Sequence, residues 1–155
     1  MIINARQEMF LKAMSFYGLK EIPGEEHNPQ ILEFFEDIGH EWIVNDETAW
    51  CSAFINWLAM KAGLESSGKL NARSWMDVGE EIKEPVIGKD VVVFWRVSKD
   101  DWRGHVGIYS GEDDDHIFTL GGNQSNMVCI KPYKKYQVLG YRRLGILRDG
   151  GPKRS

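Results

Sequence analysis

The sequence predicts an α+β fold in which helices come first and an antiparallel sheet follows. Three observations support this prediction. Apolar residues recur every three to four positions before residue 79, which is the spacing of one helix face. From residue 90 onward they form short runs or alternate with polar residues, as strands do. Glycine and acidic clusters separate these runs, so we expect an antiparallel meander of about five strands.

Two amphipathic helices are expected before the first cysteine. Residues 1–20 should contain an N-terminal helix. A second helix should begin at Pro29, with Asn28 as its N-cap, and end before Gly39. The apolar residues at helical spacing in these segments are Ala5, Met9, Ala13, Tyr17, Ile31, Leu32, Phe35 and Ile38.

The second half of the chain supplies the strands of the predicted sheet. They are expected near residues 90–97, 104–111, 116–123, 127–130 and 138–144. Residues 145–155 are expected to form a loose tail. We see no internal repeat and no linker, so residues 1–155 are expected to form a single domain.

Composition restricts the possible classes of protein. The chain has 155 residues, 43% of them hydrophobic, and no apolar run of the length that a membrane span needs. The N-terminus lacks a basic start followed by an apolar core, so we expect synthesis in the cytoplasm without a signal peptide. Two cysteines in unlike contexts do not predict a disulfide framework.

Charge is distributed unevenly along the chain. Residues 1–130 hold 11 basic and 22 acidic side chains, whereas residues 131–155 hold eight basic side chains and one acidic one. The basic C-terminal end could contact an anionic polymer, or it could be a solvated edge strand and tail. No nucleic-acid motif accompanies these charges, so nucleic acid is not an expected partner.

Cys51 occupies the most informative position in the sequence. The segment from Ala49 to Lys61 has the apolar spacing of a helix, and Gly63 follows as a stop. The first turn of a helix leaves N–H groups without partners and favours negative charge, so the thiol of Cys51 is expected to be biased toward thiolate. The alternative is that Cys51 is a small buried hydrophobic residue. Cys129 lies in an apolar run and is expected in the core.

His105 is the best partner for this thiol. If the hairpin turns at Asp113 and Asp114, paired positions sum to about 227 or 228, and His105 faces Gly122 or Asn123. His116 then pairs about seven residues away from His105. The prediction is a nucleophile at Cys51, a base at His105 and a carboxamide at Asn123 that orients the imidazole for acyl transfer.

Four ordered motifs resemble a known family. They are Trp50-Cys51-Ser52-Ala53-Phe54, Asp90-Val91-Val92-Val93-Phe94, Gly104-His105-Val106-Gly107-Ile108-Tyr109 and Gly121-Gly122-Asn123-Gln124-Ser125. In this order they resemble the CHAP family, the cysteine, histidine-dependent amidohydrolase/peptidases, and within it a phage- and prophage-associated group. The resemblance covers about residues 23–143 and implies a papain-like fold, with N-terminal helices packed on an antiparallel meander.

The resemblance also implies an activity. These proteins are peptidoglycan hydrolases. The resemblance therefore implies a single catalytic domain that cuts amide bonds in the peptide part of the bacterial cell wall, as an endopeptidase or an N-acetylmuramoyl-L-alanine amidase. Its partner is then the peptidoglycan stem peptide, reached after release or delivery from the cytoplasm as an endolysin is. The resemblance maps the catalytic residues to Cys51, His105 and Asn123. Many members carry a glutamate two residues before this asparagine, where the chain has Gly121.

Further residues are candidates for contact with substrate. Trp50, Gln124 and Trp102 lie near these motifs in the sequence and are expected to bind substrate. No metal and no cofactor are expected. Some CHAP members bind calcium before the cysteine, and residues 45–47 only faintly resemble such a site.

Three other readings stay open. The chain could be a non-catalytic module that binds the cell wall or a partner protein through a CHAP-like fold. It could use zinc held by histidines and Cys129, although no paired histidine spacing supports this. The same triad could also transfer the acyl group to an amine instead of water.

Overall fold

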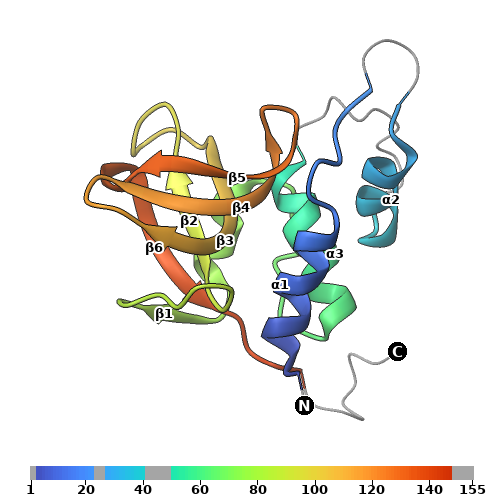
Figure 1. Ribbon diagram of the computed structural model, residues 1–155, viewed down its shortest axis with the longest axis horizontal. Coiled ribbons are helices and arrows are strands. Elements are labelled where there is room, and N and C mark those ends of the chain that lie inside the picture. Colours follow the sequence, from blue (N-terminus) through green and yellow to red (C-terminus); the bar gives the residue numbers. More distant parts are fainter. Residues whose placement is uncertain (1–2, 23–26, 41–49, 148–155) are drawn as a thin grey trace.

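The α-helices of the protein lie together on one side of a curled antiparallel sheet (Figure 1). The computed structural model describes residues 3–22, 27–40 and 50–147. The elements are α1 (Ala5–Ser15), α2 (Pro29–Asp37), α3 (Cys51–Ala62), η1 (Ala72–Asp77), β1 (Glu80–Ile82), β2 (Val91–Trp95), β3 (Gly104–Glu112), β4 (His116–Gln124), β5 (Met127–Lys134), η2 (Lys135–Gln137) and β6 (Val138–Arg143). The predicted α+β class is confirmed.

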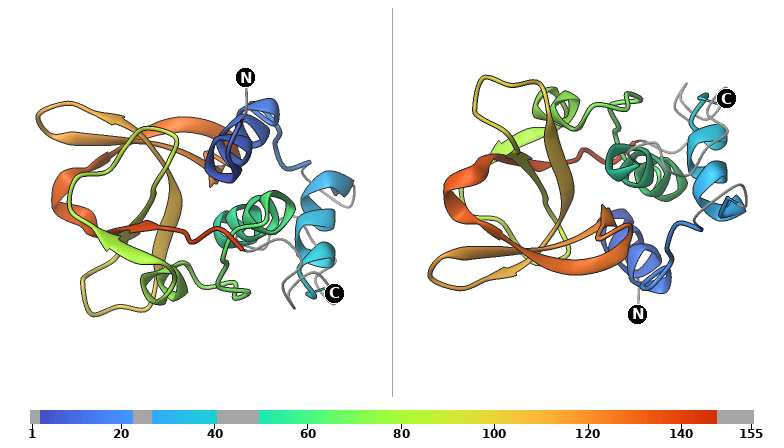
Figure 2. Two further views of the ribbon diagram at one scale, coloured as in Figure 1. Left: turned by 90° about the horizontal axis from the view of Figure 1, so that it is seen from below. Right: turned by 90° about the horizontal axis from the view of Figure 1, so that it is seen from above.

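The sheet has six strands in the order β1-β6-β2-β3-β4-β5. Five of them were expected, and β1 was missed because its three residues show no apolar alternation. Strand β6 lies between β1 and β2, so it is not the edge strand that its basic residues suggested. Figure 2 shows the strong curl of the sheet from below and above.

Local signals explain where the helices begin and end. Asn4 caps α1 in a capping box with Gln7, and Asn28 caps α2 just before Pro29. Helix α3 ends at Gly63 in a left-handed conformation. No helix in the described part of the chain has the length and hydropathy needed to cross a membrane.

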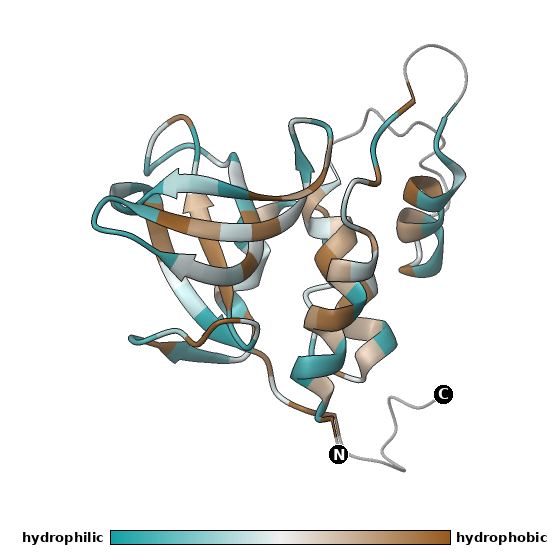
Figure 3. Ribbon diagram, in the orientation of Figure 1, coloured by the Kyte–Doolittle hydropathy of each residue, from teal (hydrophilic) through white to brown (hydrophobic). Residues whose placement is uncertain are grey.

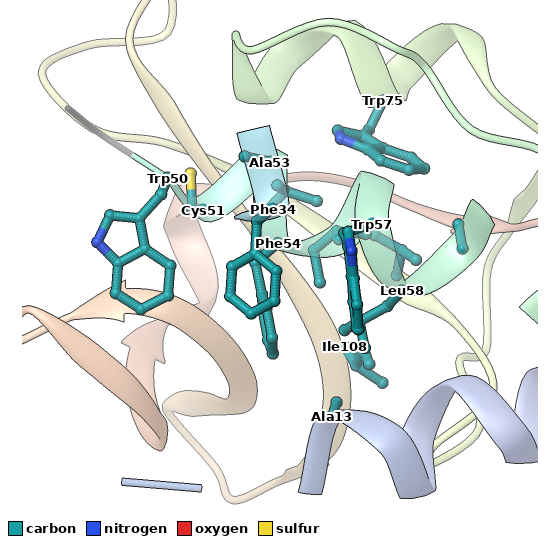
Figure 4. Close-up of a cluster of buried hydrophobic side chains, with 14 of the residues drawn as sticks. Ala13, Phe34, Trp50, Cys51, Ala53, Phe54, Trp57, Leu58, Trp75 and Ile108 are labelled. Carbon is teal, nitrogen blue, oxygen red and sulfur yellow. The ribbon is translucent and has the colours of Figure 1, made fainter. Parts of the chain in front are cut away.

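Helix α3 is the centre of the hydrophobic core. Nine of its residues, from Cys51 to Ala59, are buried between α1, α2 and the sheet. Hydrophobic residues run along much of this helix and along the middle of the strands (Figure 3). Figure 4 shows the aromatic part of this core, where Phe34, Phe54 and Trp57 pack together.

A buried polar network fixes the first turns of α3. The hydroxyl of Ser52 donates to the carbonyl of Lys69 at 2.6 Å and accepts from the indole N–H of Trp75 at 2.9 Å. The side chain of Asn56 donates to the same Lys69 carbonyl and accepts from the N–H of Gly68. Because buried polar groups are costly without partners, these contacts hold the N-terminus of α3 in one position.

Several basic residues of the C-terminal end have structural roles. Arg142 donates to the carbonyls of Val78 and Gly79. Arg143 forms two hydrogen bonds to the fully buried carboxylate of Asp90, at 2.7 and 2.8 Å. These two side chains therefore join β6 to other parts of the protein, Arg142 to the segment before β1 and Arg143 to the residue before β2. Residues 148–155 lie outside the described residues.

The start of the expected tail is anchored. The N–H of Gly145 donates to Glu65, and the N–H of Leu147 donates to the carbonyl of Gly63. Ile146 pairs with Leu64 in an isolated bridge. The expectation of a loose tail is thus wrong for residues 145–147, because backbone hydrogen bonds join them to the segment after α3.

The Asp90–Arg143 pair predicts a stability difference. Replacing Asp90 with Asn removes the charge opposite Arg143, so the free energy of unfolding should fall by about 3 kcal/mol, as measured by urea denaturation. Lys135→Gln breaks the exposed pair with Glu112 and is the matched control, for which we expect a loss of less than about 1 kcal/mol. Equal losses for the two variants would contradict a structural role for the buried pair.

Candidate active site

Cys51 and His105 line one cavity of about 320 Å³. The described residues around it are Cys51, Arg96, Gly104, His105, Asn123, Gln124, Ser125, Asn126, Lys131 and Tyr133. They come from the start of α3, the end of β2, the start of β3, the β4–β5 hairpin and β5. The three predicted catalytic residues, Cys51, His105 and Asn123, thus line the same cavity, although the first and the last are 72 residues apart in the sequence.

Cys51 is the first residue of α3. Trp50 is the N-cap and forms no side-chain capping bond. The backbone N–H groups of Val106, Ser52 and Cys51 itself act on the thiol and favour its charged form. In Figure 4 the sulfur points away from the rings of Phe34 and Phe54. The thiol therefore lies at the boundary between the core and the cavity.

Burial decides the protonation state of this thiol. The side chain is 7% exposed, and desolvation raises the pKa of Cys51 above its ordinary value. The backbone N–H groups and Arg96 oppose this shift but do not overcome it. The expected bias toward thiolate is therefore wrong for the resting protein, because desolvation outweighs the helix N-terminus.

His105 is also neutral at neutral pH. Burial lowers the pKa of His105 to about 4, the hydrogen bond with Gln124 opposes this change, and Arg96 and Lys131 add to it. The imidazole stacks on Tyr133, with ring centroids 4.9 Å apart. Tyr133 also stacks on Phe94, at 4.7 Å. The aromatic side chains thus hold the imidazole in a dry position.

The hydrogen-bond partner of the imidazole is Gln124 and not Asn123. The Nε2 atom of His105 lies 2.8 Å from Oε1 of Gln124. The predicted register is correct for the pairs nearer the site, because Ile108 faces Leu120 and Tyr109 faces Thr119, which gives the predicted sum of 228. It shifts by one residue toward the turn, where Glu112 faces Ile117. The difference arises beyond these pairs, near the end of β4.

A bulge near the end of β4 explains this difference. Pairing between β4 and β5 shifts between Gly121 and Gln124, and Asn123 has a φ of 59°. A bulge of this kind reverses the alternation of side chains. The side chain of Gln124 therefore reaches the face that carries His105. Asn123 tolerates the left-handed conformation, and two glycines precede it in the sequence. The run Gly121-Gly122-Asn123 was therefore the sequence signal that could have predicted the bulge.

The glycines before the bulge make room for the site. A Cβ at Gly121 would lie 2.8 Å from Oε1 of Gln124 and 3.4 Å from Nε2 of His105. The carboxamide of Gln124 thus occupies the space that a side chain at position 121 would enter. A Cβ at Gly122 would lie 2.5 Å from the ring of Trp50, so this glycine lets β4 approach the start of α3.

The orientation of the Gln124 amide determines the tautomer of His105. The Nε2 atom of Gln124 donates to the carbonyls of Cys129 at 2.6 Å and Thr119 at 3.2 Å. Two carbonyl acceptors require the NH₂ group at that end, so Oε1 faces the imidazole as an acceptor. The neutral imidazole must then carry its proton on Nε2. This leaves Nδ1 of His105 as the unprotonated nitrogen.

The other predicted substrate contacts have different positions. Trp50 is fully buried, and its indole N–H donates to Glu21 at 2.8 Å, so it is part of the core and does not face the cavity. Trp102 is 71% exposed in the loop between β2 and β3, beside Arg103, and does not line the cavity. Gln124 lines the cavity, but its amide is engaged with His105 and two carbonyls.

The remaining histidine and cysteine residues have other surroundings. His116 lies beside Asp113 in the β3–β4 hairpin, away from the cavity. Cys129 is half-buried, and its thiol contacts the carbonyl of Gln124 at 3.5 Å. No cluster of three metal-binding side chains occurs among residues 3–22, 27–40 and 50–147. The candidate calcium segment, residues 45–47, lies outside these ranges.

The state of the thiol predicts how fast it reacts. In a Cys129→Ala variant, Cys51 is the one remaining cysteine. Its alkylation by iodoacetamide should depend on pH with an apparent pKa above about 8.5, the value of a free thiol, because burial raises the pKa of Cys51. The reaction should be followed by mass spectrometry from pH 5 to pH 10. An apparent pKa below about 7 would mean a preformed thiolate.

Comparisons with known proteins support the fold. No family model matches the chain, and no curated protein matches it. Among solved structures, the chain is similar to a Staphylococcus aureus protein described as similar to lipoprotein and assigned to the NLP/P60 family. The TM-score is 0.55 and the identity 19%, over 94% of this chain and 42% of that protein, so the chain spans less than half of its neighbour. The likeness supports the α+β fold of the chain, which resembles the fold of this NLP/P60 protein.

Proposed function

We propose that the protein is a cysteine hydrolase that cuts amide bonds in the peptide part of bacterial peptidoglycan. The observation that carries the proposal is the hydrogen-bonded set of His105 and Gln124 beside the thiol of Cys51, in one cavity. The papain-like fold supports the chemistry, and the likeness to an NLP/P60 protein supports a role at the cell wall. The CHAP-like motifs favour a phage-type or endolysin-like enzyme.

The proposed reaction begins with two neutral groups. Nδ1 of His105 takes the proton of the Cys51 thiol as the sulfur attacks the carbonyl carbon of the substrate amide. The backbone N–H of Cys51, at the start of α3, stabilises the negative charge that forms on the carbonyl oxygen. The imidazolium then gives its proton to the leaving amine, and the C–N bond breaks. The product is a thioester on Cys51.

Water completes the proposed cycle. Nδ1 of His105 takes a proton from water as the oxygen attacks the thioester, and the proton returns to the departing sulfur. Throughout the cycle Gln124 keeps the imidazole in one tautomer, so it is a positioning residue. Asn123 lines the cavity and is available to contact the substrate.

Removing the nucleophile tests the proposal. Cys51→Ala should abolish the release of new amino groups from purified peptidoglycan, because no other described group in the cavity can form the thioester. Cys129→Ala is the matched control, since it removes the other cysteine side chain but keeps the carbonyl that accepts from Gln124. This control should stay active. Mass spectrometry of the fragments then identifies the bond that is cut.

Two other outcomes lead to different conclusions. If neither wild type nor Cys51→Ala releases amines, yet both sediment with cell walls, the protein is a binding module. If the fragments carry an added amine instead of water, the enzyme is an acyl transferase. Full activity of Cys51→Ala would contradict the proposed nucleophile.

A second prediction separates the two carboxamides. Gln124→Leu should lower kcat by about 100-fold with little change in KM, because the imidazole loses its fixed tautomer. Asn123→Ala, the neighbouring control, should change kcat by less than about tenfold, because no hydrogen bond joins Asn123 to His105 in the structure. Thermal unfolding of both variants shows whether they are folded. A larger loss of kcat in Asn123→Ala would reverse the assignment.

A further inference from the structure

The cavity beside Cys51 carries positive charge. Arg96 and Lys131 line it, and both side chains are exposed. None of the described lining residues is Asp or Glu. Within residues 50–147 neither cation forms an ion pair. The ammonium of Lys131 donates to the hydroxyl of Ser125 at 3.2 Å, and the guanidinium of Arg96 donates to no described acceptor. Both charges are therefore available to a ligand.

The curl of the sheet brings these two cations to the same end of the site. Phe94 of β2 and Tyr133 of β5 stack at 4.7 Å, although two strands separate β2 from β5 in the sheet. Arg96 comes two residues after Phe94, and Lys131 comes two residues before Tyr133. The two strands run in opposite directions, so both steps lead toward the same end of the sheet.

The two charges also act on the reacting groups. Both cations contribute to the lowered pKa of His105, and Arg96 opposes the raised pKa of Cys51. These effects require that the charges lie near the imidazole and the thiol. A group bound between Arg96 and Lys131 would therefore lie within a residue or two of the amide that is cut.

We propose that Arg96 and Lys131 form a carboxylate-binding subsite, which selects peptides that carry a free carboxylate next to the scissile amide. This inference rests on the proposed function and adds the class of substrate. A guanidinium offers paired donors that match the two oxygens of a carboxylate, and an ammonium adds a second charge. Asn126, Asn123 and Ser125 also line this cavity and provide neutral polar groups around the ligand.

The test compares one substrate with and without its carboxylates. Peptidoglycan is digested with a muramidase to soluble muropeptides, and half of the digest is converted to carboxamides with carbodiimide and ammonia. The amidated digest keeps its shape and loses its negative charge. Hydrolysis of both digests is measured for wild type, Arg96→Gln and Lys131→Gln. Lys134→Gln is the matched control, because Lys134 is exposed on β5 and does not line the cavity.

The wild type should have a kcat/KM at least about tenfold higher for the free carboxylates than for the carboxamides, as expected for a charge-assisted contact. Arg96→Gln and Lys131→Gln should each reduce this ratio, because loss of a cation weakens hydrolysis of the free carboxylates more than hydrolysis of the carboxamides. Lys134→Gln should keep the wild-type ratio. Equal hydrolysis of both digests by the wild type would overturn the subsite and leave the proposed function in place.

Binding separates the subsite from the catalytic activity. Cys51→Ala, with and without Arg96→Gln, is titrated with both digests by calorimetry. If no protein hydrolyses either digest, tighter binding of the free carboxylates that depends on Arg96 would support the subsite, while the proposed hydrolysis fails. Absence of both hydrolysis and this difference in binding would overturn the subsite as well.

Discussion

The hydrogen bond between Gln124 and His105 is the constraint on which the site depends. It exists because a bulge at Asn123 reverses the side-chain alternation near the end of β4. Two backbone carbonyls then fix the direction of the Gln124 amide, and the amide fixes the tautomer of the imidazole. A backbone irregularity of one residue therefore determines which nitrogen of His105 can act as a base.

The surroundings of the reacting pair combine a dry interior with a charged opening. Burial keeps both Cys51 and His105 neutral at neutral pH, since desolvation raises the pKa of the thiol and lowers that of the imidazole. In the proposed reaction, the thiol proton would then move during the attack itself and not before it. Arg96 and Lys131 add two exposed positive charges at the same cavity, which favour the anionic group of the proposed substrate.

The fold holds the sulfur and the imidazole at fixed places by two different means. On the helix side, Ser52 and its polar partners hold the first turn of α3 against η1 and the segment that precedes it. On the sheet side, Gly122 allows β4 to approach Trp50 closely. Together these contacts bring Cys51 close to His105, although the two residues are far apart in the sequence. The rest of the core supports this arrangement.

The sequence by itself determined the α+β class, the helix that begins near Cys51 and the hairpin register that places His105 near residue 123, because these follow from local periodicity and turn composition. It did not determine that Gln124 replaces Asn123 or that Trp50 is buried. Those outcomes depend on a bulge and on packing between distant segments, which local patterns do not encode. The neutral thiol was also decided by tertiary structure, since desolvation arises from all the groups that surround Cys51.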